Sequence, residues 1–211
     1  MTQPEEWIGL SVSTIYEAAG REGLLRPGFS RVTKTARVVV RDRTVECGQD
    51  DNLGVHIAID RLLPGEILVV TMPEPRPVAV VGEILALFAK TNGAVGLMID
   101  AAVRDVDELA EVGLPVWARW ITSTGAIKSD PGRHDVKVSV GGQTISSGDL
   151  LVLDGDGLVR VPPESEKYTL DTLKTRVVQE EWLMSKLAAG ELTLDLMNLL
   201  ILVDQCSLSN H

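Results

Sequence analysis

The sequence predicts an α/β protein built on a largely parallel sheet, and two observations carry this prediction. Apolar runs of strand length recur at residues 36–40, 67–71, 95–99 and 115–120. Segments with a helical pattern fall between them, at residues 52–62, 82–90 and 107–112. Strands and helices that alternate in this way are typical of parallel strands joined by crossover helices, with both faces of the sheet covered.

The ends of these elements carry recognisable signals. A first helix is expected at residues 11–19 with Ser13 as its N-cap, and Asn52 is expected to cap the second helix. That second helix should turn Leu53, Ile57 and Ile59 inward. The turn pair Pro64-Gly65 precedes the strand at 67–71, and Asn92-Gly93 should end the helix at 82–90.

The second half of the chain has a different character. Short strands are expected at residues 136–140, 143–145, 150–153 and 158–161, because glycine-rich pairs typical of tight antiparallel turns separate them. One long helix should follow at residues 165–189, about 37 Å at 1.5 Å per residue. It is long for such a domain, so its far end is expected to pack on a neighbouring subunit. No linker interrupts the chain, which predicts one domain over residues 1–211.

Composition narrows the classes of function. The 211 residues carry a formal net charge of −10, which argues against binding to nucleic acid or to an anionic membrane surface. The longest apolar run falls short of a membrane span. Cys47 and Cys206 lie far apart with no CxxC spacing, and no signal peptide is recognised, so reduced thiols in a cytoplasmic protein are expected.

The most informative segment runs from residue 81 to residue 105. It opens with Gly82-Glu83-Ile84-Leu85 at an expected helix start, where the first N–H groups lack intrahelical partners. A glycine allows a ligand to approach the backbone, and a substrate carboxylate would accept those free N–H groups. The alternative is that Glu83 only stabilises its own helix as an acidic first-turn residue.

The segment closes with Arg104-Asp105, just beyond an expected strand. Ligand sites of parallel sheets lie beyond the carboxyl ends of the strands. Arg104 can hold a carboxylate through two hydrogen bonds, and Asp105 offers a hard oxygen to Mg²⁺ or Mn²⁺. The alternative is a salt bridge that fixes the loop. Asp100, at the strand end, is expected to orient Arg104 or to cap the loop.

A third candidate is the pair Glu180-Glu181 on the long helix. Glu180 falls on the apolar stripe formed by Leu173, Val177, Met184 and Leu187, where a carboxylate is costly unless it is paired or bound to an ion. If the stripe docks on a neighbouring subunit, one of the two glutamates would reach the site of that subunit. An ordinary solvated pair is the alternative.

Other residues give weaker signals. His56, His134 and His211 lack the spacing of metal ligands, so each is expected to be structural. The segment Asp154-Gly155-Asp156-Gly157 lacks the distal Glu of a calcium loop and predicts a hairpin turn. Lys128 is either a second cation near the site or a solvated loop residue. No GxGxxG or P-loop motif is present.

Taken together, these fragments resemble the family that contains 4-hydroxy-4-methyl-2-oxoglutarate aldolase and the regulator of ribonuclease activity A. The family pattern has a Gly-Asp/Glu-x-Leu helix start, then a strand with two glycines and an aspartate that ends in Arg-Asp. Further similar segments are found along nearly the whole chain. The matching positions are Gly82-Glu83-Ile84-Leu85, Gly93, Gly96, Asp100, Arg104, Asp105, Thr44-Val45, Asp51-Asn52, Pro115-Val116-Trp117-Ala118-Arg119, Gly141-Gly142, Gly148-Asp149-Leu150, Asp154, Gly157-Leu158-Val159 and Leu187-Ala188-Ala189-Gly190-Glu191-Leu192.

The long helix and Trp117-Ala118-Arg119 make the chain more similar to the aldolase branch. The resemblance implies an α/β sandwich with a swivelling β/β/α core and a mixed sheet, assembled as trimers or hexamers with sites between subunits. By the same resemblance, residues 82–85 and Arg104 bind substrate and Asp105 binds the metal directly. Glu83, and Glu180 or Glu181 of a neighbouring subunit, would hold the metal through water.

The implied activity is a divalent-metal-dependent cleavage of a 4-hydroxy-2-oxo acid to pyruvate and a second 2-oxo acid. Because loss of CO₂ from oxaloacetate gives the same enolate, oxaloacetate decarboxylase activity is expected too. The main alternative is a non-catalytic regulator of ribonuclease activity that binds a protein partner; a methyltransferase is disfavoured by the absence of a nucleotide-binding loop. Two positions depart from the family: Ala101 replaces a frequent glycine, and residues 200–211 continue apolar.

Overall fold

The computed structural model describes residues 1–26, 28–34 and 37–201. A nine-stranded mixed sheet has the strand order β1-β6-β5-β3-β2-β10-β11, with β4 paired to β5 and β7 paired to β2. Its centre is parallel: β2 pairs with β3, β3 with β5, β4 with β5 and β5 with β6, with register shifts in the last two pairs, while β1, β7, β10 and β11 pair antiparallel. The predicted α/β class is therefore confirmed.

The strands of the parallel centre follow the apolar runs of the sequence, but several extend further than predicted. They are β2 (Val38–Glu46), β3 (Glu66–Thr71), β4 (Ala79–Val81), β5 (Gly96–Val103) and β6 (Val116–Ile121). Strand β2 continues six residues past the expected end, because β3 pairs with residues 41–46 and β7 with Val45 and Glu46, which satisfies their polar backbone groups. Ala36, in the predicted strand, lies outside the described residues.

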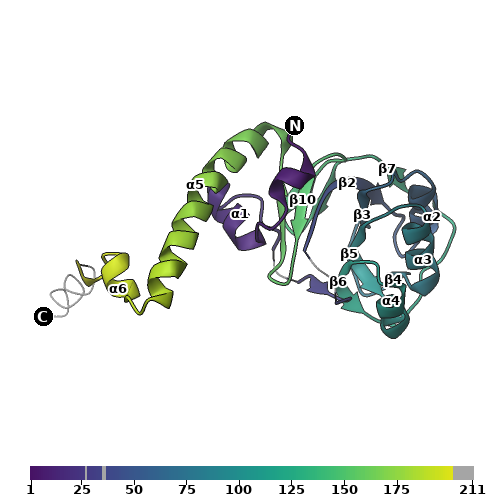
Figure 1. The fold of residues 1–211 in the computed structure, drawn as a ribbon. Coiled ribbons are helices and arrows are strands. Elements are labelled where there is room, and N and C mark those ends of the chain that lie inside the picture. The colour runs from purple at the N-terminus through teal and green to yellow at the C-terminus, as the bar shows by residue number, and fades with distance from the viewer. Residues whose placement is uncertain (27, 35–36, 202–211) are drawn as a thin grey trace, which may run out of the picture.

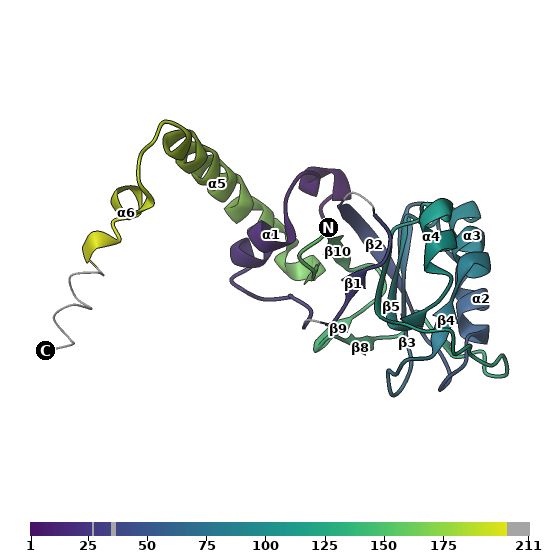
Figure 2. The same cartoon turned by 90° about the horizontal axis from the view of Figure 1, so that it is seen from below.

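Helices cover one face of this sheet. Figures 1 and 2 show α2 (Leu53–Asp60), α3 (Glu83–Thr91) and α4 (Val106–Val112) together on the same side. Side-chain alternation along β3 explains the division: Leu68 and Val70 belong to the core beneath these helices, whereas Ile67 and Val69 belong to the core of the opposite face. Both faces are buried, as predicted.

The opposite face is covered by strands rather than helices. A two-stranded sheet of β8 (Val138–Val140) and β9 (Gln143–Ile145) packs there, so the layers run β/β/α. The hairpin of β10 (Leu150–Leu153) and β11 (Leu158–Val161) joins the edge of the large sheet, with the Asp154–Gly157 segment as its predicted turn. The short strands β1 (Ser30–Arg31) and β7 (Arg133–His134) were not predicted, and neither was β4 of the parallel centre.

The N-terminal elements pack on the long C-terminal helix. Here η1 (Pro4–Trp7) and α1 (Val12–Ala18) form a third core with β10, β11 and the first turns of α5 (Pro163–Ala188). The predicted N-cap of α1 was wrong by two residues: Ser11, not Ser13, caps the helix, and its Oγ accepts a hydrogen bond from Thr14 N at 3.0 Å.

The long helix was predicted with nearly its observed bounds. Figures 1 and 2 show α5 leaving the sheet on the side away from α2, α3 and α4, followed by the short helix α6 (Thr193–Leu196). Its first half packs through Leu170 and Leu173, but Trp182 and Met184 in its second half are exposed. No helix in the described part of the chain has the length and apolar character needed to cross a membrane.

Candidate functional site

The predicted helix start at Gly82 is present, and the residues around it meet as the sequence suggested. Gly82 is the N-cap of α3, directly after β4, and Arg104-Asp105 follow β5. Because β4 and β5 are parallel neighbours, their carboxyl ends bring these two segments together. The Asp105 Oδ2 atom accepts a hydrogen bond from Glu83 N at 3.2 Å, so the aspartate satisfies one free N–H of the helix.

Gly82 has no room for a side chain. A Cβ atom at this position would lie 2.3 Å from Asp105 Oδ2 and 3.0 Å from Arg104 Cγ. The backbone of Gly82 is extended (φ −141°, ψ −165°), a conformation open to any residue, so it is the close approach that requires glycine here. The glycine thus allows the two charged side chains to lie against the start of α3.

The backbone of Asp105 is strained. It has φ 57° and ψ 48°, in the left-handed region that a non-glycine residue enters at a cost of about 1 kcal/mol. The Asp105 carbonyl accepts a hydrogen bond from Leu109 N at 2.8 Å and so starts α4. Strain of this kind clusters at functional sites, and here it directs the aspartate toward α3.

Arg104 and Asp105 form the ion pair that was the alternative interpretation of this segment, with Nε and Oδ2 3.4 Å apart. Their side chains are 47% and 38% exposed, so the pair contributes little to folding stability. Two such half-exposed groups beside a helix start remain accessible to a ligand. The salt bridge and the ligand site, weighed as alternatives from the sequence, are therefore compatible.

These residues line a cavity of about 140 Å³. Its lining includes both cations of the region, Arg104 and Lys128, and one acid, Asp105. Lys128 is thus the second cation near the site that the sequence left open. Ile84 and Leu85, in the first turn of α3, line the same cavity, and the N–H groups of a first helical turn lack intrahelical partners. A cavity with two cations, one carboxylate and a helix N-terminus suits a small anionic ligand.

The loop that carries Lys128 is held by a buried aspartate. Asp51 Oδ2 accepts hydrogen bonds from the backbone N–H groups of Ser129 and Asp130 at 2.6 Å and 3.0 Å, and Asp51 Oδ1 accepts one from Leu53 N at 2.8 Å. Burial alone would raise the pKa of Asp51, but these hydrogen bonds outweigh it and lower the pKa below its usual value of 3.8. The ionised aspartate therefore fixes the loop against the start of α2.

Two residues of the lining were not assigned to the site from the sequence. Asn52 was expected to cap α2, but its Nδ2 donates to Val80 O at 3.0 Å, and Asp51 accepts the hydrogen bond from Leu53 N instead. His56, one helical turn further, was expected to be structural. The sequence did contain a signal for these two residues. Their i, i+4 spacing puts both on one face of a helix, and that helix starts just beyond a parallel strand, where ligand sites lie.

Three further expectations about side chains need correction. Asp100 lies inside β5, almost fully buried, and pairs with Arg119 rather than Arg104. Burial raises the pKa of Asp100, although hydrogen bonds from Arg119 and Thr71 oppose that shift. Leu53 and Ile57 of α2 are only half-buried, and the inward face of that helix is formed by Gly54, Val55, Ala58 and Ile59.

Glu180 and Glu181 are not near the cavity of their own chain. Glu180 Oε1 accepts a hydrogen bond from Arg176 Nε at 2.9 Å, and α5 extends away from α2, α3 and α4 (Figure 1). Glu181 is exposed. Among the residues that the structure describes, no group of three or more His, Cys, Asp and Glu side chains is placed to hold a metal ion. A divalent cation at Asp105 would therefore take most of its ligands from water or from another subunit.

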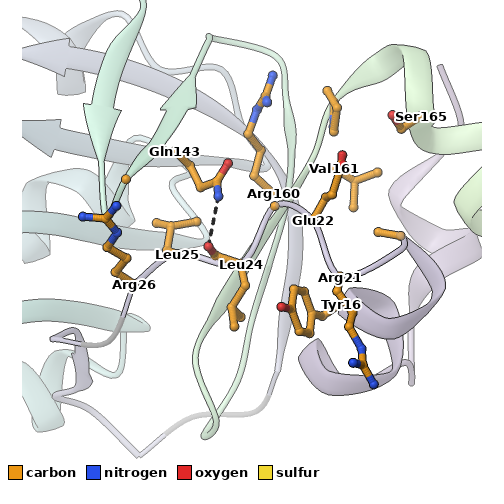
Figure 3. A pocket seen from close by; sticks show the side chains of 15 residues that line it. Tyr16, Arg21, Glu22, Leu24, Leu25, Arg26, Gln143, Arg160, Val161 and Ser165 are labelled. Atoms are coloured by element: carbon orange, nitrogen blue, oxygen red, sulfur yellow. Dashed lines mark hydrogen bonds between the residues drawn. The ribbon is translucent and has the colours of Figure 1, made fainter.

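A larger cavity, of about 580 Å³, lies elsewhere in the fold. Figure 3 shows its lining, where Gln143 Nε2 donates to Leu24 O at 3.1 Å. Arg160 is engaged by Asp149, with Nε and Oδ2 2.5 Å apart. Arg21 and Arg26 also line it, with Glu22 as the one acid among the described lining residues. The smaller cavity differs in that its charged groups lie at a helix N-terminus, beyond the carboxyl ends of parallel strands.

The remaining predicted polar residues lie away from the site. His134 belongs to β7, where its Nε2 atom lies 2.9 Å from Pro131 O. Cys47 is buried, and burial raises its pKa to about 12, so the thiol stays protonated. Cys206, His211 and the end of the apolar tail lie outside the described residues.

The fold and the cavity define a mixed α/β protein with β/β/α layers and a small cationic cavity at a helix N-terminus. The chain belongs to the RraA-like family, described as Aldolase/RraA, whose model matches residues 12–160. The resemblance seen in the sequence motifs is thereby confirmed.

Individual relatives carry names of two kinds. A protein of Halalkalibacterium halodurans named "Putative 4-hydroxy-4-methyl-2-oxoglutarate aldolase" is 30% identical over 161 residues, covering 73% of this chain and 77% of that protein. The RNA-processing inhibitor RraA from Thermus thermophilis has 28% identity and a TM-score of 0.67, covering 74% of this chain and 94% of its own. An uncharacterized protein from Pseudomonas syringae pv. tomato DC3000 reaches a TM-score of 0.78 at 25% identity, over 89% of this chain and 92% of its own. The family thus includes proteins named as aldolases and as inhibitors of RNA processing.

Proposed function

We propose that this protein is a divalent-metal-dependent pyruvate aldolase. It cleaves acids of the 4-hydroxy-4-methyl-2-oxoglutarate or 4-carboxy-4-hydroxy-2-oxoadipate type into pyruvate and a second 2-oxo acid, and it also decarboxylates oxaloacetate. The observation that carries the proposal is the absence of space at Gly82, which lets Arg104 and Asp105 lie against the N-terminus of α3. The relative named as an aldolase adds support.

Substrate binding follows from the charges around the cavity. The carboxylate beside the 2-oxo group is held by Arg104 and by the N–H groups of Ile84 and Leu85 at the start of α3. Lys128, across the same cavity, faces the second carboxylate of a diacid. Substrates with two negative charges are therefore preferred over monoacids.

Asp105 fits a hard divalent cation, Mg²⁺ or Mn²⁺. Its Oδ2 atom is occupied by Glu83 N and Arg104, but it is a half-exposed carboxylate with a second oxygen, Oδ1, which suits such an ion. When bound, the cation supplies Lewis acidity toward the 2-oxo group and stabilises the negative charge that develops there. Glu83, and Glu180 or Glu181 of a neighbouring subunit, complete its surroundings through water.

The reaction moves one proton and breaks one carbon–carbon bond. A water held by Glu83 and by the glutamate of the neighbouring subunit takes the proton of the 4-hydroxyl group. The C4–O bond becomes a carbonyl, the C3–C4 bond breaks, and its electron pair forms the enolate of pyruvate. Arg104 beside the enolate lowers the energy of this anion. The carboxylate of Glu83 receives the proton through that water, and its return to C3 gives pyruvate.

The proposal includes a homotrimer or homohexamer with sites between subunits, which the placement of α5 supports. Its second half presents exposed apolar side chains, among them Val178, Trp182 and Met184, on the same helix as Glu180 and Glu181. Apolar residues this dense on one exposed helix are typical of a subunit contact. A neighbouring subunit that covers them would carry the glutamates toward another chain.

The proposal is tested by pyruvate release from oxaloacetate and from 4-hydroxy-4-methyl-2-oxoglutarate, with Mg²⁺ and with a chelator. Both activities should require the metal. Arg104→Ala should lower kcat/KM by about 10²- to 10³-fold for both substrates, and Asp105→Ala should abolish both. Arg61→Ala and Asp107→Ala, which change exposed residues outside the cavity, serve as matched controls. Full activity of Asp105→Ala would refute the proposal.

A second candidate function is regulation of a ribonuclease by direct binding, suggested by the neighbour titled as an RNA-processing inhibitor and by the net charge of −10. It predicts that the Asp105→Ala and Arg104→Ala variants keep full function. Inhibition of a ribonuclease by these variants, together with no pyruvate release by the wild type, would favour regulation over catalysis.

A further inference from the structure

Two residues that line the small cavity, Asn52 and His56, each carry a buried polar atom without a hydrogen-bond partner among the described residues. Asn52 is only 7% exposed, and because its Nδ2 donates to Val80 O, its Oδ1 carries the remaining hydrogen-bonding capacity. Neither Asn52 Oδ1 nor the buried Nε2 of His56 finds a hydrogen-bond partner within the described part of the chain. A buried polar group left unpaired costs about 1–3 kcal/mol, so a pair of them in one cavity indicates a ligand that satisfies both.

Helical spacing places both residues at the same wall. Asn52 precedes the first residue of α2 and His56 lies four positions later, so the two side chains are neighbours on one side of the helix. Both line the cavity that also contains Arg104, Asp105 and Lys128. The residues that carry the unpaired atoms therefore share one cavity with the groups assigned to substrate carboxylate and metal.

The chemistry of the two atoms selects the kind of ligand group. An amide oxygen only accepts hydrogen bonds, and so does a carboxylate. A carboxylate placed against Asn52 Oδ1 would therefore be repelled rather than hydrogen-bonded. Burial lowers the pKa of His56, and the nearby charge of Lys128 lowers it further, so the ring stays neutral. A neutral imidazole with its proton on Nε2 donates one hydrogen bond. A hydroxyl group satisfies both atoms at once, because it donates to Asn52 Oδ1 and accepts from His56 Nε2–H.

We propose that Asn52 and His56 form a hydroxyl-binding subsite that receives the 4-hydroxyl group of the aldol substrate and makes the enzyme selective for hydroxylated 2-oxo acids. This inference rests on the proposed aldolase function. In the bound substrate the hydroxyl proton points to Asn52 Oδ1. During cleavage the O–H bond turns to the water that takes the proton, while His56 Nε2–H stays on the oxygen and stabilises its growing negative charge.

Oxaloacetate provides the internal comparison, since it yields the same pyruvate enolate but has no 4-hydroxyl group. We therefore expect His56→Leu to lower kcat/KM for 4-hydroxy-4-methyl-2-oxoglutarate by about 10- to 100-fold, as expected for a lost hydrogen bond to developing charge. The ratio of aldolase to decarboxylase kcat/KM should fall by a similar factor. His56→Gln, which keeps an N–H donor on a side chain of similar reach, should restore part of the ratio.

The same measurement on Asn52→Ala tests the other half of the subsite, and thermal unfolding shows whether each variant folds. His134→Leu, the same exchange outside the cavity, is the matched control and should leave the ratio unchanged. An equal fall in both activities of His56→Leu would overturn the subsite and leave His56 a structural role. Unchanged activities would show that a trapped water satisfies the pair. Absence of both activities in the wild type would overturn the aldolase function itself, and the subsite with it.

Discussion

Replacing Gly82 by alanine is the most direct test of the site geometry. The added Cβ would lie 2.3 Å from Asp105 Oδ2, whereas ordinary van der Waals contacts of Cβ atoms begin near 3.4 Å. Relief of the clash therefore moves the carboxylate by about 1 Å, a displacement that costs about 10²-fold in rate when it affects a catalytic group. The extended backbone of Gly82 accepts alanine without strain.

The stability of the Gly82→Ala variant should change little. The clashing atom ends a short side chain that can rotate, and exchanging glycine for alanine at an N-cap costs about 1 kcal/mol or less. The hydrogen bond from Glu83 N to Asp105 Oδ2 is lost with the rotation. We therefore expect a fall of about 10²-fold in kcat/KM for pyruvate release and weaker Mn²⁺ binding by titration calorimetry, with nearly unchanged thermal unfolding.

Two other glycines give a graded series for the same assay. At Gly125 a Cβ would lie 3.1 Å from a terminal nitrogen of Arg104, so Gly125→Ala should have a smaller effect. At Gly155 the nearest atom is 3.8 Å away and belongs to Arg31, so Gly155→Ala is the matched control with no expected effect. Wild-type activity and metal affinity in Gly82→Ala, or equal losses in all three variants, would refute the reasoning.

Two further outcomes are expected from other parts of the molecule. Burial, reinforced by the charge of Asp149, raises the pKa of Asp42 from 3.8 to about 8, and both of its oxygens lack partners among the described residues. The protonated carboxyl contributes stability that is complete below pH 3.8 and is lost as the pH rises through about 8. Asp42→Asn should therefore raise the free energy of unfolding at pH 7 by up to about 4 kcal/mol and weaken its fall with rising pH. Urea unfolding at pH 5 and pH 8 measures this, and identical pH dependence in variant and wild type would contradict it. Trp182→Glu places a charge on the exposed apolar part of α5 and should dissociate the proposed oligomer in native mass measurements, with Lys167→Glu at the other end of the helix as control. An unchanged mass of the Trp182 variant would exclude this face from the contact.

Local signals in the sequence determined most elements of the fold. Gly82 at the start of α3 and Asn92-Gly93 at its end specify the helix through backbone preferences that need no distant partner. The glycine-rich turns of the second half similarly specified the short strands. Arg104-Asp105 beyond a parallel strand could be assigned to the same sheet edge as Gly82, because that edge follows from the order of strands and helices.

Tertiary structure alone decided the lengths of strands and the partners of buried charges. Strand β5 continues to Val103 because β4 and β6 pair with Ala102 and Val103, and this carries Asp100 into the core beside Arg119. Asn52 fits the pattern of a helix cap, yet Val80, distant in sequence, takes its amide and turns it into part of the cavity wall. Propensities act over a few neighbouring residues, whereas hydrogen-bond partners and cavities arise from segments that meet only after folding; for that reason the charged part of the site was predictable and its polar wall was not.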